Sequence, residues 1–254
     1  MAITIKSERE IELMAEAGKI LERVHNELEK ALRPGMSTKD VDTLGEEIIR
    51  SYGCIPSFLN YNGYPASICV SVNQEVVHGI PDKHRIIQEG DIVSLDAVVI
   101  YKGYHSDAAR THAVGEVSEE AKKLIQVTKE SFLEGIKFAK AGNHLFDISG
   151  AIGRYAEERG YGVVRDLCGH GIGTALHEAP EIPNYEVGRK GVRLRPGMTL
   201  AIEPMINIGT HEVDWLDDDW TVVTRDGSLS AHYENTILIT EGEPRILSLT
   251  CENE

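Results

Sequence analysis

An internal repeat constrains the fold of this chain more than any other feature. The segment GMSTKDVDTLGEEIIRSYG, which begins at Gly35, is matched by GNHLFDISGAIGRYAEERG, which begins at Gly142. IIQEGDIVSLD and RLRPGMTLAIE stand at the same offset of 107 residues and align Asp96 with Glu203. Glycine and aspartate also recur at helix ends for local reasons, but one offset shared by separate segments indicates duplication. We therefore expect two similar α+β halves that pack about a pseudo-twofold axis.

A predicted β-hairpin places two carboxylates on one face of a sheet. The strand-like segments Ile92–Tyr101 and Tyr104–Thr111 flank Lys102-Gly103, and glycine as the second turn residue suits a two-residue loop. In that register Asp96 and Asp107 are diagonal neighbours with Cα atoms roughly 7–8 Å apart. A three-residue turn would separate them, and each can instead face solvent or be hydrogen-bonded. If they meet, they repel each other and lose hydration, and a cation between them removes both penalties.

The second half of the chain supplies a matching pair of acids. Glu203 lies in the predicted strand Met198–Ile206, and Glu234 lies in the next one, Ser230–Thr240. A single glutamate in a strand usually faces solvent, whereas two matching pairs in a duplicated sheet are expected to share one site. Oxygen-rich sites of this kind suit Mn, Fe, Co or Zn, the more so once a histidine joins.

Helix signals alternate with these strands. Ser7 and Glu10 form a capping box for the first helix, which ends near Pro34-Gly35. The other predicted helices begin at Ser37, at Ser118 and at about Leu145. A further strand-like region surrounds Ser67–Val77.

Charge and cysteine usage exclude some classes of function. A net charge of -15 argues against nucleic acid or an anionic membrane as the main partner and suits metal cations, although a solvated acidic surface accounts for most of it. No pair of cysteines has CxxC spacing, so we expect free thiols in a reducing compartment: Cys54, Cys69, Cys168 and Cys251. The chain shows no signal-peptide pattern and no apolar run of membrane length, so we expect a cytoplasmic protein.

Three histidines stand in loop-forming surroundings. His170 in LCGHGIG is flanked by glycines, and we expect a loop that brings a nitrogen ligand to the four acids. His78 in VVHGIP and His177 in LHEAP can donate to a substrate carbonyl or an oxyanion, although structural histidines are commoner. No role is assigned to the remaining histidines: His25, His84, His105, His112, His144, His211 and His232.

The complete pattern resembles the type I methionine aminopeptidases. The similarity runs from about Ser7 to Leu249 and rests on Asp96 and Asp107, eleven residues apart, then CGHGIG, AIEPM and YENTI. It implies the pita-bread fold, an α/β structure of two pseudo-symmetric halves in which helices cover a mainly antiparallel sheet. The expected organisation is one catalytic domain: residues 1–254, with halves at about 7–115 and 116–249.

The resemblance also implies a reaction and its metal ligands. The reaction is metal-dependent removal of the N-terminal methionine from peptides and nascent proteins with a small second residue. The cofactors would be two divalent ions (Co, Mn, Fe or Zn). Asp107 and Glu234 would bridge both ions and Asp96 would bind one. The other would be bound by His170 and by Glu203, which would also shuttle a proton.

Further expectations from the resemblance concern the substrate. His78 and His177 would contact it during catalysis. The pocket for the methionine side chain would be lined by five residues: Tyr61, Tyr64, Cys69, Leu176 and Trp220. A Na or K ion would be held by carbonyls near Asn73, Glu75 and Ser230. We expect a monomer that acts on N-terminal methionine peptides and on nascent chains at the ribosome, without binding nucleic acid or a membrane.

Three other interpretations fit parts of the pattern. An aminopeptidase P or prolidase shares the fold but usually has a separate N-terminal domain. A non-catalytic binding protein with this fold would be expected to have lost ligands, and all five are present. A dimetal phosphoesterase needs basic residues near the metals, and only Arg110 closely flanks the ligands.

Overall fold

The computed structural model describes residues 2–249, so Met1 and Cys251 lie outside the described residues. The described helices are α1 (Glu8–Ala31), α2 (Thr38–Ser51), the 3-10 helix η1 (Tyr61–Gly63), α3 (Glu119–Ile136) and α4 (Leu145–Glu157). The first seven strands are β1 (Ile55–Pro56), β2 (Ile68–Val72), β3 (Glu75–Val77), β4 (Ile92–Tyr101), β5 (Tyr104–Ala113), β6 (Gly162–Val163) and β7 (Gly169–Gly171). The others are β8 (Glu178–Ile182), β9 (Thr199–Ile202), β10 (Met205–Asn207), β11 (Val213–Trp215), β12 (Val222–Thr224), β13 (Ser230–His232), β14 (Glu234–Leu238) and β15 (Arg245–Ile246).

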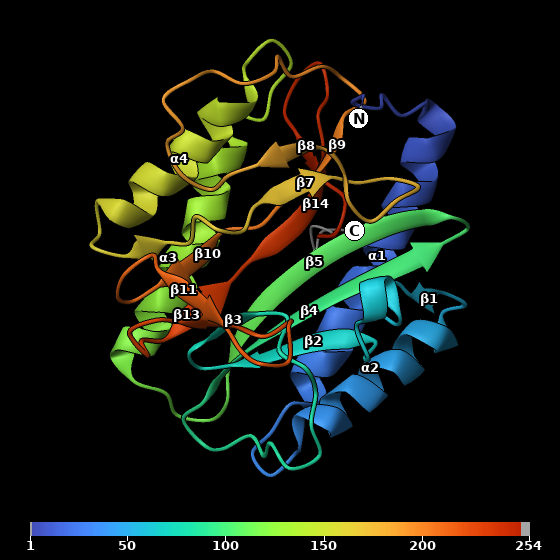
Figure 1. Ribbon diagram of the computed structural model, residues 1–254. Helices are drawn as coiled ribbons and strands as arrows, with labels where there is room; N and C mark the ends of the chain where they lie inside the picture. The colour runs from blue at the N-terminus through green and yellow to red at the C-terminus, as the bar shows by residue number, and fades with distance from the viewer. Residues whose placement is uncertain (1, 250–254) are drawn as a thin grey trace.

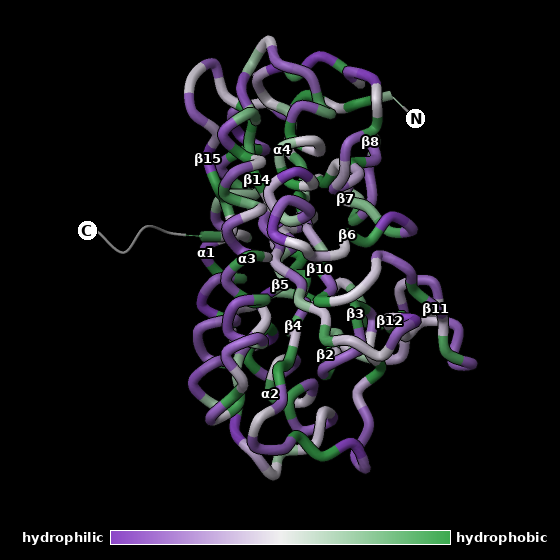
Figure 2. The backbone as a smooth tube through the Cα atoms, turned by 90° about the vertical axis from the view of Figure 1, so that its left-hand side faces the viewer, coloured by the Kyte–Doolittle hydropathy of each residue, from purple (hydrophilic) through white to green (hydrophobic). Residues whose placement is uncertain are grey.

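A nine-stranded sheet forms the centre of the molecule. Its order is β1-β4-β5-β14-β9-β7-β8, with β2 beside β4 and β15 beside β14, and its strand pairs are antiparallel. Figure 2 shows α1 and α3 on one side of this sheet and the small β11–β12 hairpin on the other. The predicted sheet covered by helices is confirmed. Among residues 2–249, no helix combines the length and the apolar character needed to cross a membrane.

The backbone repeats itself at the predicted offset of 107 residues. At the start of α2 the N–H of Ser37 donates to Asp40 at 2.8 Å. At the start of α4 the N–H of His144 donates to Asp147, also at 2.8 Å. The aspartates that recur in the sequence therefore cap equivalent helices, which lie at opposite ends of the sheet in Figure 1. The same offset relates two isolated β-bridges: Ser37 with Ile86, and His144 with Arg193.

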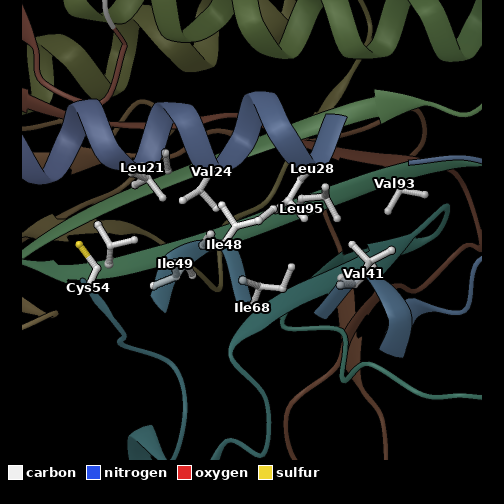
Figure 3. Close-up of a cluster of buried hydrophobic side chains, with 14 of the residues drawn as sticks. Leu21, Val24, Leu28, Val41, Ile48, Ile49, Cys54, Ile68, Val93 and Leu95 are labelled. Atoms are coloured by element: carbon white, nitrogen blue, oxygen red, sulfur yellow. The ribbon is translucent and has the colours of Figure 1, made fainter. Parts of the chain in front are cut away.

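Each half has its own apolar core between helices and sheet. In the first half, Leu21, Val24 and Leu28 of α1 pack with Leu95 of β4, as Figure 3 shows. Fully burying each such side chain contributes about 1.5–3 kcal/mol. The matching core of the second half includes residues of α3, α4, β9 and β14. These two cores hold the helices against the sheet from one side and leave its other face to the polar side chains described below.

The central hairpin forms as predicted. β4 and β5 pair Tyr101 with Tyr104, and the turn residues Lys102 and Gly103 have φ values of 49° and 86°. Positive φ at both turn positions is the type I′ geometry that matches the twist of the strands. The register is therefore the one that puts Asp96 and Asp107 on the same face.

Two predicted strands are wrong in their extent. The expected strand Met198–Ile206 is broken into β9 and β10, because Pro204 has no N–H for the ladder and β10 pairs with β13 in a separate sheet. The expected strand Ser230–Thr240 is likewise divided at Tyr233 into β13 and β14. Glu203 and Glu234 therefore lie where the chain passes between the main sheet and the smaller one.

Candidate metal centre

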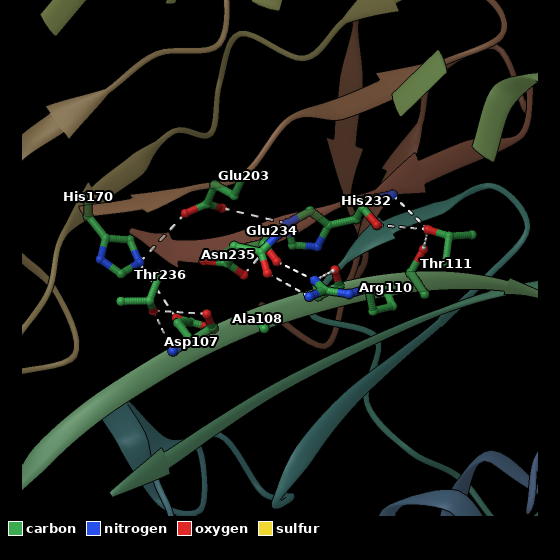
Figure 4. Close-up of polar contacts among 12 residues, drawn as sticks. Asp107, Ala108, Arg110, Thr111, His170, Glu203, His232, Glu234, Asn235 and Thr236 are labelled. Atoms are coloured by element: carbon green, nitrogen blue, oxygen red, sulfur yellow. Dashed lines mark hydrogen bonds and ion pairs between the residues drawn. The ribbon is translucent and has the colours of Figure 1, made fainter. Parts of the chain in front are cut away.

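Four acidic side chains converge above the middle of the main sheet. β4 pairs with β5 so that Asp96 is opposite Ala109, and β14 pairs with β5 so that Glu234 is also opposite Ala109. Asp107 lies two residues before Ala109 on the same face of β5. Glu203 approaches from the corner after β9, and Figure 4 shows it facing Asp107 and Glu234 across a common space. The structure thus brings together all four predicted acids.

Burial makes this cluster unfavourable without a cation. Burial and then repulsion by Glu234 raise the pKa of Asp107 well above its usual range. The pKa of Glu234 is raised by burial and then by Glu203, and that of Glu203 by burial and then by Asp107. The pKa of Asp96 is raised by burial and then by Asp107. Oxygen atoms without a hydrogen-bond partner remain on three of the side chains: Asp96 Oδ1, Asp107 Oδ1 and Glu234 Oε1.

His170 adds a nitrogen acceptor to the same space. Its Nδ1 is 2.8 Å from the carbonyl oxygen of Gly171, which can only accept, so Nδ1 carries the proton. Burial lowers its pKa to about 3, which keeps the ring neutral at pH 7. The lone pair of Nε2 therefore faces Asp107 Oδ2 at 3.7 Å and Glu203 Oε1 at 3.6 Å. Acceptors that face one another in this way need a proton or a metal cation between them.

The geometry of this group fits a divalent metal. One ligand atom each from Asp107, His170 and Glu234 lies within 4.8 Å of the other two. Nitrogen and oxygen ligands sit about 2.0–2.2 Å from a zinc-like ion, so ligands of one ion lie at most about 4.4 Å apart, and small side-chain shifts bring these three atoms to one ion. The Nδ1–H bond to a backbone carbonyl is the usual partner that orients a ligating histidine.

The prediction of a loop around His170 is wrong. His170 lies in strand β7, between β8 and β9. Its glycine neighbours are needed for close packing in the sheet, because a Cβ on Gly169 would lie 2.4 Å from the carbonyl oxygen of Ala201. A Cβ on Gly171 would lie 2.2 Å from that of Ala179. The glycines thus let a ligand-bearing strand fit between its neighbours.

Sequence reasoning missed His232, which also reaches the cluster. Its Nε2 is 3.9 Å from Glu234 Oε2 and 4.0 Å from Glu203 Oε2, and neither ring nitrogen has a hydrogen-bond partner. Burial lowers its pKa to about 3. The signal was present in the sequence, because His232 and Glu234 are two residues apart in a strand-like segment and such residues share a face.

An apolar cluster adjoins the acids on the side of the first half. Tyr64, Cys69 and Leu176 belong to this buried cluster, and Tyr61 and Trp220 pack against it. Cys69 of β2 is directly opposite Asp96 of β4, so the cluster begins one strand away from the carboxylates. The five predicted pocket residues are therefore neighbours in space.

The two predicted substrate histidines lie in loops that border this cluster. The Nδ1 of His177 is 2.6 Å from the hydroxyl of Tyr61, and its ring centroid is 4.3 Å from that of His170. The ring of His78 contacts Trp220, with centroids 6.2 Å apart. The pKa of His177 is lowered by burial, and that of His78 is lowered to about 4 by burial and then by His177. Both rings are therefore neutral at pH 7.

Comparison with known proteins identifies the family. The model of metallopeptidase family M24 matches residues 12–241. The chain is 57% identical to a methionine aminopeptidase of Clostridium acetobutylicum, over 98% of this chain and 100% of that one. A solved methionine aminopeptidase of Thermotoga maritima has a TM-score of 0.96 and 47% identity, over 98% of this chain and 100% of that one. The chain belongs to metallopeptidase family M24, among the type I methionine aminopeptidases.

Proline-directed M24 relatives share the fold with lower identity. An Xaa-Pro dipeptidase of Bacillus anthracis has a TM-score of 0.78 and 28% identity, and the match covers 98% of this chain but 63% of that one. An X-Pro aminopeptidase of Thermotoga maritima, at 23% identity and a TM-score of 0.76, shows the fold alone. The pita-bread fold is therefore confirmed, and the full-length likeness is to the methionine aminopeptidases.

A cavity with a volume of about 630 Å³ opens beside His170 and His177. Its lining includes His170, His177, Cys168, Glu178 and Arg189. Open space therefore reaches His170, one of the five predicted ligands.

The three residues of the predicted monovalent-cation site lie close together. The N–H of Ser230 donates to the carbonyl oxygen of Asn73 at 2.9 Å. Asn73 has a φ of 59°, and the side chain of Glu75 accepts from the N–H of Val72 at 2.7 Å. The carbonyl of Asn73 is thus already hydrogen-bonded, and the role of this group stays a prediction.

Proposed function

We propose that this chain removes the N-terminal methionine from peptides with a small second residue, by hydrolysis that depends on divalent metal ions. The observation that carries the proposal is the buried group of four carboxylates and one histidine lone pair beside an apolar cluster. Its ligands would be Asp96, Asp107, His170, Glu203 and Glu234. Membership of the methionine aminopeptidases supports the same reaction.

The ligand set suits two divalent ions. Asp107 and Glu234, whose ligand atoms lie within 4.8 Å of each other, would help to hold both ions. Asp96 would complete one position, and His170 with Glu203 the other. One nitrogen among carboxylate oxygens fits Mn, Fe, Co or Zn. When bound, such a pair polarises a carbonyl and lowers the pKa of a water molecule.

Glu203 would move a proton. Its side chain is 14% exposed, against 5% for Asp107 and 2% for Glu234, so it borders the open side of the cluster. It lies at the corner after β9, beside His170. Its carboxylate takes a proton from the attacking water and passes it to the nitrogen of the leaving peptide.

His177 would stabilise the oxyanion. Its Nδ1 is hydrogen-bonded to the hydroxyl of Tyr61 at 2.6 Å, and with that hydroxyl as the donor the neutral ring carries its proton on Nε2. That N–H can donate to the carbonyl oxygen of the scissile bond as negative charge develops there, an effect worth about 3–4 kcal/mol in comparable sites. His78, held at a φ of 59° in its loop, offers a second neutral donor on the other side of the apolar cluster.

The apolar cluster fits an unbranched, polarisable side chain. Tyr64 and Trp220 meet edge to face with centroids 5.1 Å apart and form an aromatic wall. Methionine sulfur makes favourable contacts with such rings, worth about 0.3–1.5 kcal/mol each. Because Cys69 is opposite Asp96, a side chain against this cluster leaves its own amine and carbonyl at the acids.

The proposal extends to the setting of the reaction. The substrates would include nascent chains at the ribosome, the protein would be a cytoplasmic monomer, and a Na or K ion would bind near Asn73, Glu75 and Ser230. Support for the last point is the turn in which Asn73 meets Ser230. The negative net charge of -15 argues against nucleic acid as a direct partner.

Arg110 does not support phosphate chemistry. Its guanidinium donates to the backbone carbonyl of Glu234, to Ala109 O at 2.7 Å and to Asn235 Oδ1 at 2.6 Å. It also lies over the ring of Tyr233, 4.6 Å from the centroid. These contacts occupy the one basic side chain next to the ligands, so a phosphoesterase is disfavoured.

Turnover of short peptides by metal-free protein reloaded with single metals tests the proposal. We expect hydrolysis of Met-Ala-Ser, none of Ala-Pro-Ala, and loss of both metal and activity in Asp107→Ala. Cleavage of Ala-Pro-Ala alone would indicate a proline-directed enzyme. An Asp107→Ala protein that hydrolyses Met-Ala-Ser at the parent rate would overturn the metal assignment.

A further inference from the structure

The two halves of the main sheet meet at a short ladder between β5 and β14. Backbone pairing there consists of Glu234 with Ala109 and Asn235 with Ala108. β4, the other neighbour of β5, is in contrast paired with β5 over ten residues. The ligands Asp107 and Glu234 come from opposite sides of this seam. Their separation therefore depends on what holds the seam beyond its two backbone pairs.

A threonine hydroxyl continues the seam at Asp107. The register places Thr236 opposite Asp107, one residue beyond the last backbone pair. Thr236 Oγ1 accepts the N–H of Asp107 at 2.9 Å and donates to the carbonyl oxygen of Asp107 at 3.0 Å. Thr236 is fully buried, and Figure 4 shows it beside Asp107. Both backbone polar groups of a proposed ligand are thus satisfied by one side chain of the opposite strand.

A second threonine does the same at the other end of the ladder. Thr111 of β5 is opposite His232 in the same register. Its Oγ1 accepts the N–H of His232 at 2.9 Å and donates to the carbonyl oxygen of His232 at 2.9 Å. The single proton of the Thr111 hydroxyl is used in this bond. Ser94 Oγ, 2.7 Å from Thr111 Oγ1, must therefore donate to Thr111. The seam is therefore closed at both ends by hydroxyl groups.

We propose that Thr236 is a positioning residue of the metal centre, an inference that rests on the proposed function. Its hydroxyl fixes the backbone of Asp107 against β14, two residues from Glu234 on the same strand. This contact sets the distance between the two carboxylates that would share both ions. Thr111 fixes His232 by the same means. Neither hydroxyl touches the substrate or the ions, so each acts through the residue opposite it.

Affinity for Co²⁺ in the metal-free protein, followed by visible absorption, tests the inference without measuring activity. Thr236→Val keeps the shape of the side chain but leaves the N–H and C=O of Asp107 without partners. We expect its Kd for Co²⁺ to rise about 10–100-fold, as for other residues that orient metal ligands. Thr236→Ser restores the hydroxyl and is expected to return the Kd to the parent value.

Thr128 offers a matched control. It is also buried, and its Oγ1 donates to the carbonyl oxygen of Leu124 at 2.8 Å within α3. Thr128→Val therefore removes a buried hydroxyl of the same kind away from the seam, and we expect an unchanged Kd. If Thr236→Val does not fold, Thr111→Val carries the same expectation of weaker Co²⁺ binding, because Thr111 holds the backbone of His232, two residues before the ligand Glu234.

The outcomes separate this inference from the proposed function. If Asp107→Ala binds Co²⁺ as the parent does, the metal centre itself is wrong. If Asp107→Ala loses Co²⁺ while Thr236→Val keeps the parent Kd, only the role of Thr236 is overturned. Failure of Thr236→Ser to restore the Kd, or an equal loss in Thr128→Val, would also overturn it, because the hydroxyl would not be the cause.

Discussion

Replacing Asp107 by asparagine should stabilise the metal-free protein. The change keeps the shape of the side chain and removes one of the buried charges that repel one another. Ligand atoms of Asp107 and Glu234 lie within 4.8 Å. At that separation and an effective dielectric constant of ~20, two unit charges repel by about 3.5 kcal/mol. No hydrogen bond to Asp107 Oδ1 is lost, since this atom has no partner.

The expected result is a rise of about 3 kcal/mol in the free energy of unfolding at pH 8, measured by urea denaturation in EDTA. In a chain of this size such a gain raises Tm by roughly 6–12 °C. Saturating Mn²⁺ should reverse the order, because only the parent protein gains binding energy from the ions. Thus the same residue lowers stability without metal and raises it with metal.

The sign of the pH dependence follows from the raised pKa of Asp107. A carboxyl whose pKa is higher in the folded than in the unfolded state, where it is about 3.9, costs stability progressively as the pH rises above 4. The advantage of Asp107→Asn should therefore grow with pH and vanish toward pH 4. Equal or lower stability of the variant in EDTA at pH 8 would refute the idea that uncompensated charge defines this site.

Three further expectations concern other parts of the structure. His177→Ala should cut kcat for Met-Ala-Ser about 10²–10³-fold with unchanged metal content by atomic absorption, and metal loss would place His177 among the ligands. Tyr61→Phe should lower kcat less than His177→Ala does, because it removes only the hydroxyl that orients His177. An unchanged kcat would show that Tyr61 does not orient His177. Gly18→Ala should lower Tm by several degrees, because the new Cβ would lie 1.9 Å from the carbonyl oxygen of Leu247. Each kcal/mol of stability lost lowers Tm by about 2–4 °C. An unchanged Tm would show that this contact relaxes.

Local rules predicted much of the fold. The capping box at Ser7 and the helix start at Ser37 depend on neighbouring residues only, and both form as expected. The hairpin register follows from the conformation demanded at Lys102-Gly103. Because the register was right, the shared face of Asp96 and Asp107 was right as well. These local rules do not fix where one half of the domain ends, so the division between the two halves near residue 115 stays a prediction.

Long-range pairing could not be predicted in the same way. Nothing local states that β14 lies between β5 and β9, or that the chain leaves the main sheet at Glu203-Pro204. His170 was expected in a loop because glycine permits turns, but here its glycine neighbours permit close strand packing. His232 was missed although its two-residue spacing from Glu234 predicts a shared face, and only its approach to Glu203 depends on that same pairing.

Anomalous diffraction from crystals of the protein grown with Mn²⁺ shows whether metal ions bind at the acidic cluster. We predict two strong peaks among Asp96, Asp107, His170, Glu203 and Glu234, with Asp107 and Glu234 contacting both. The same crystals of Asp107→Asn should lack at least one peak. Peaks elsewhere in the molecule, with none among these five side chains, would contradict the account.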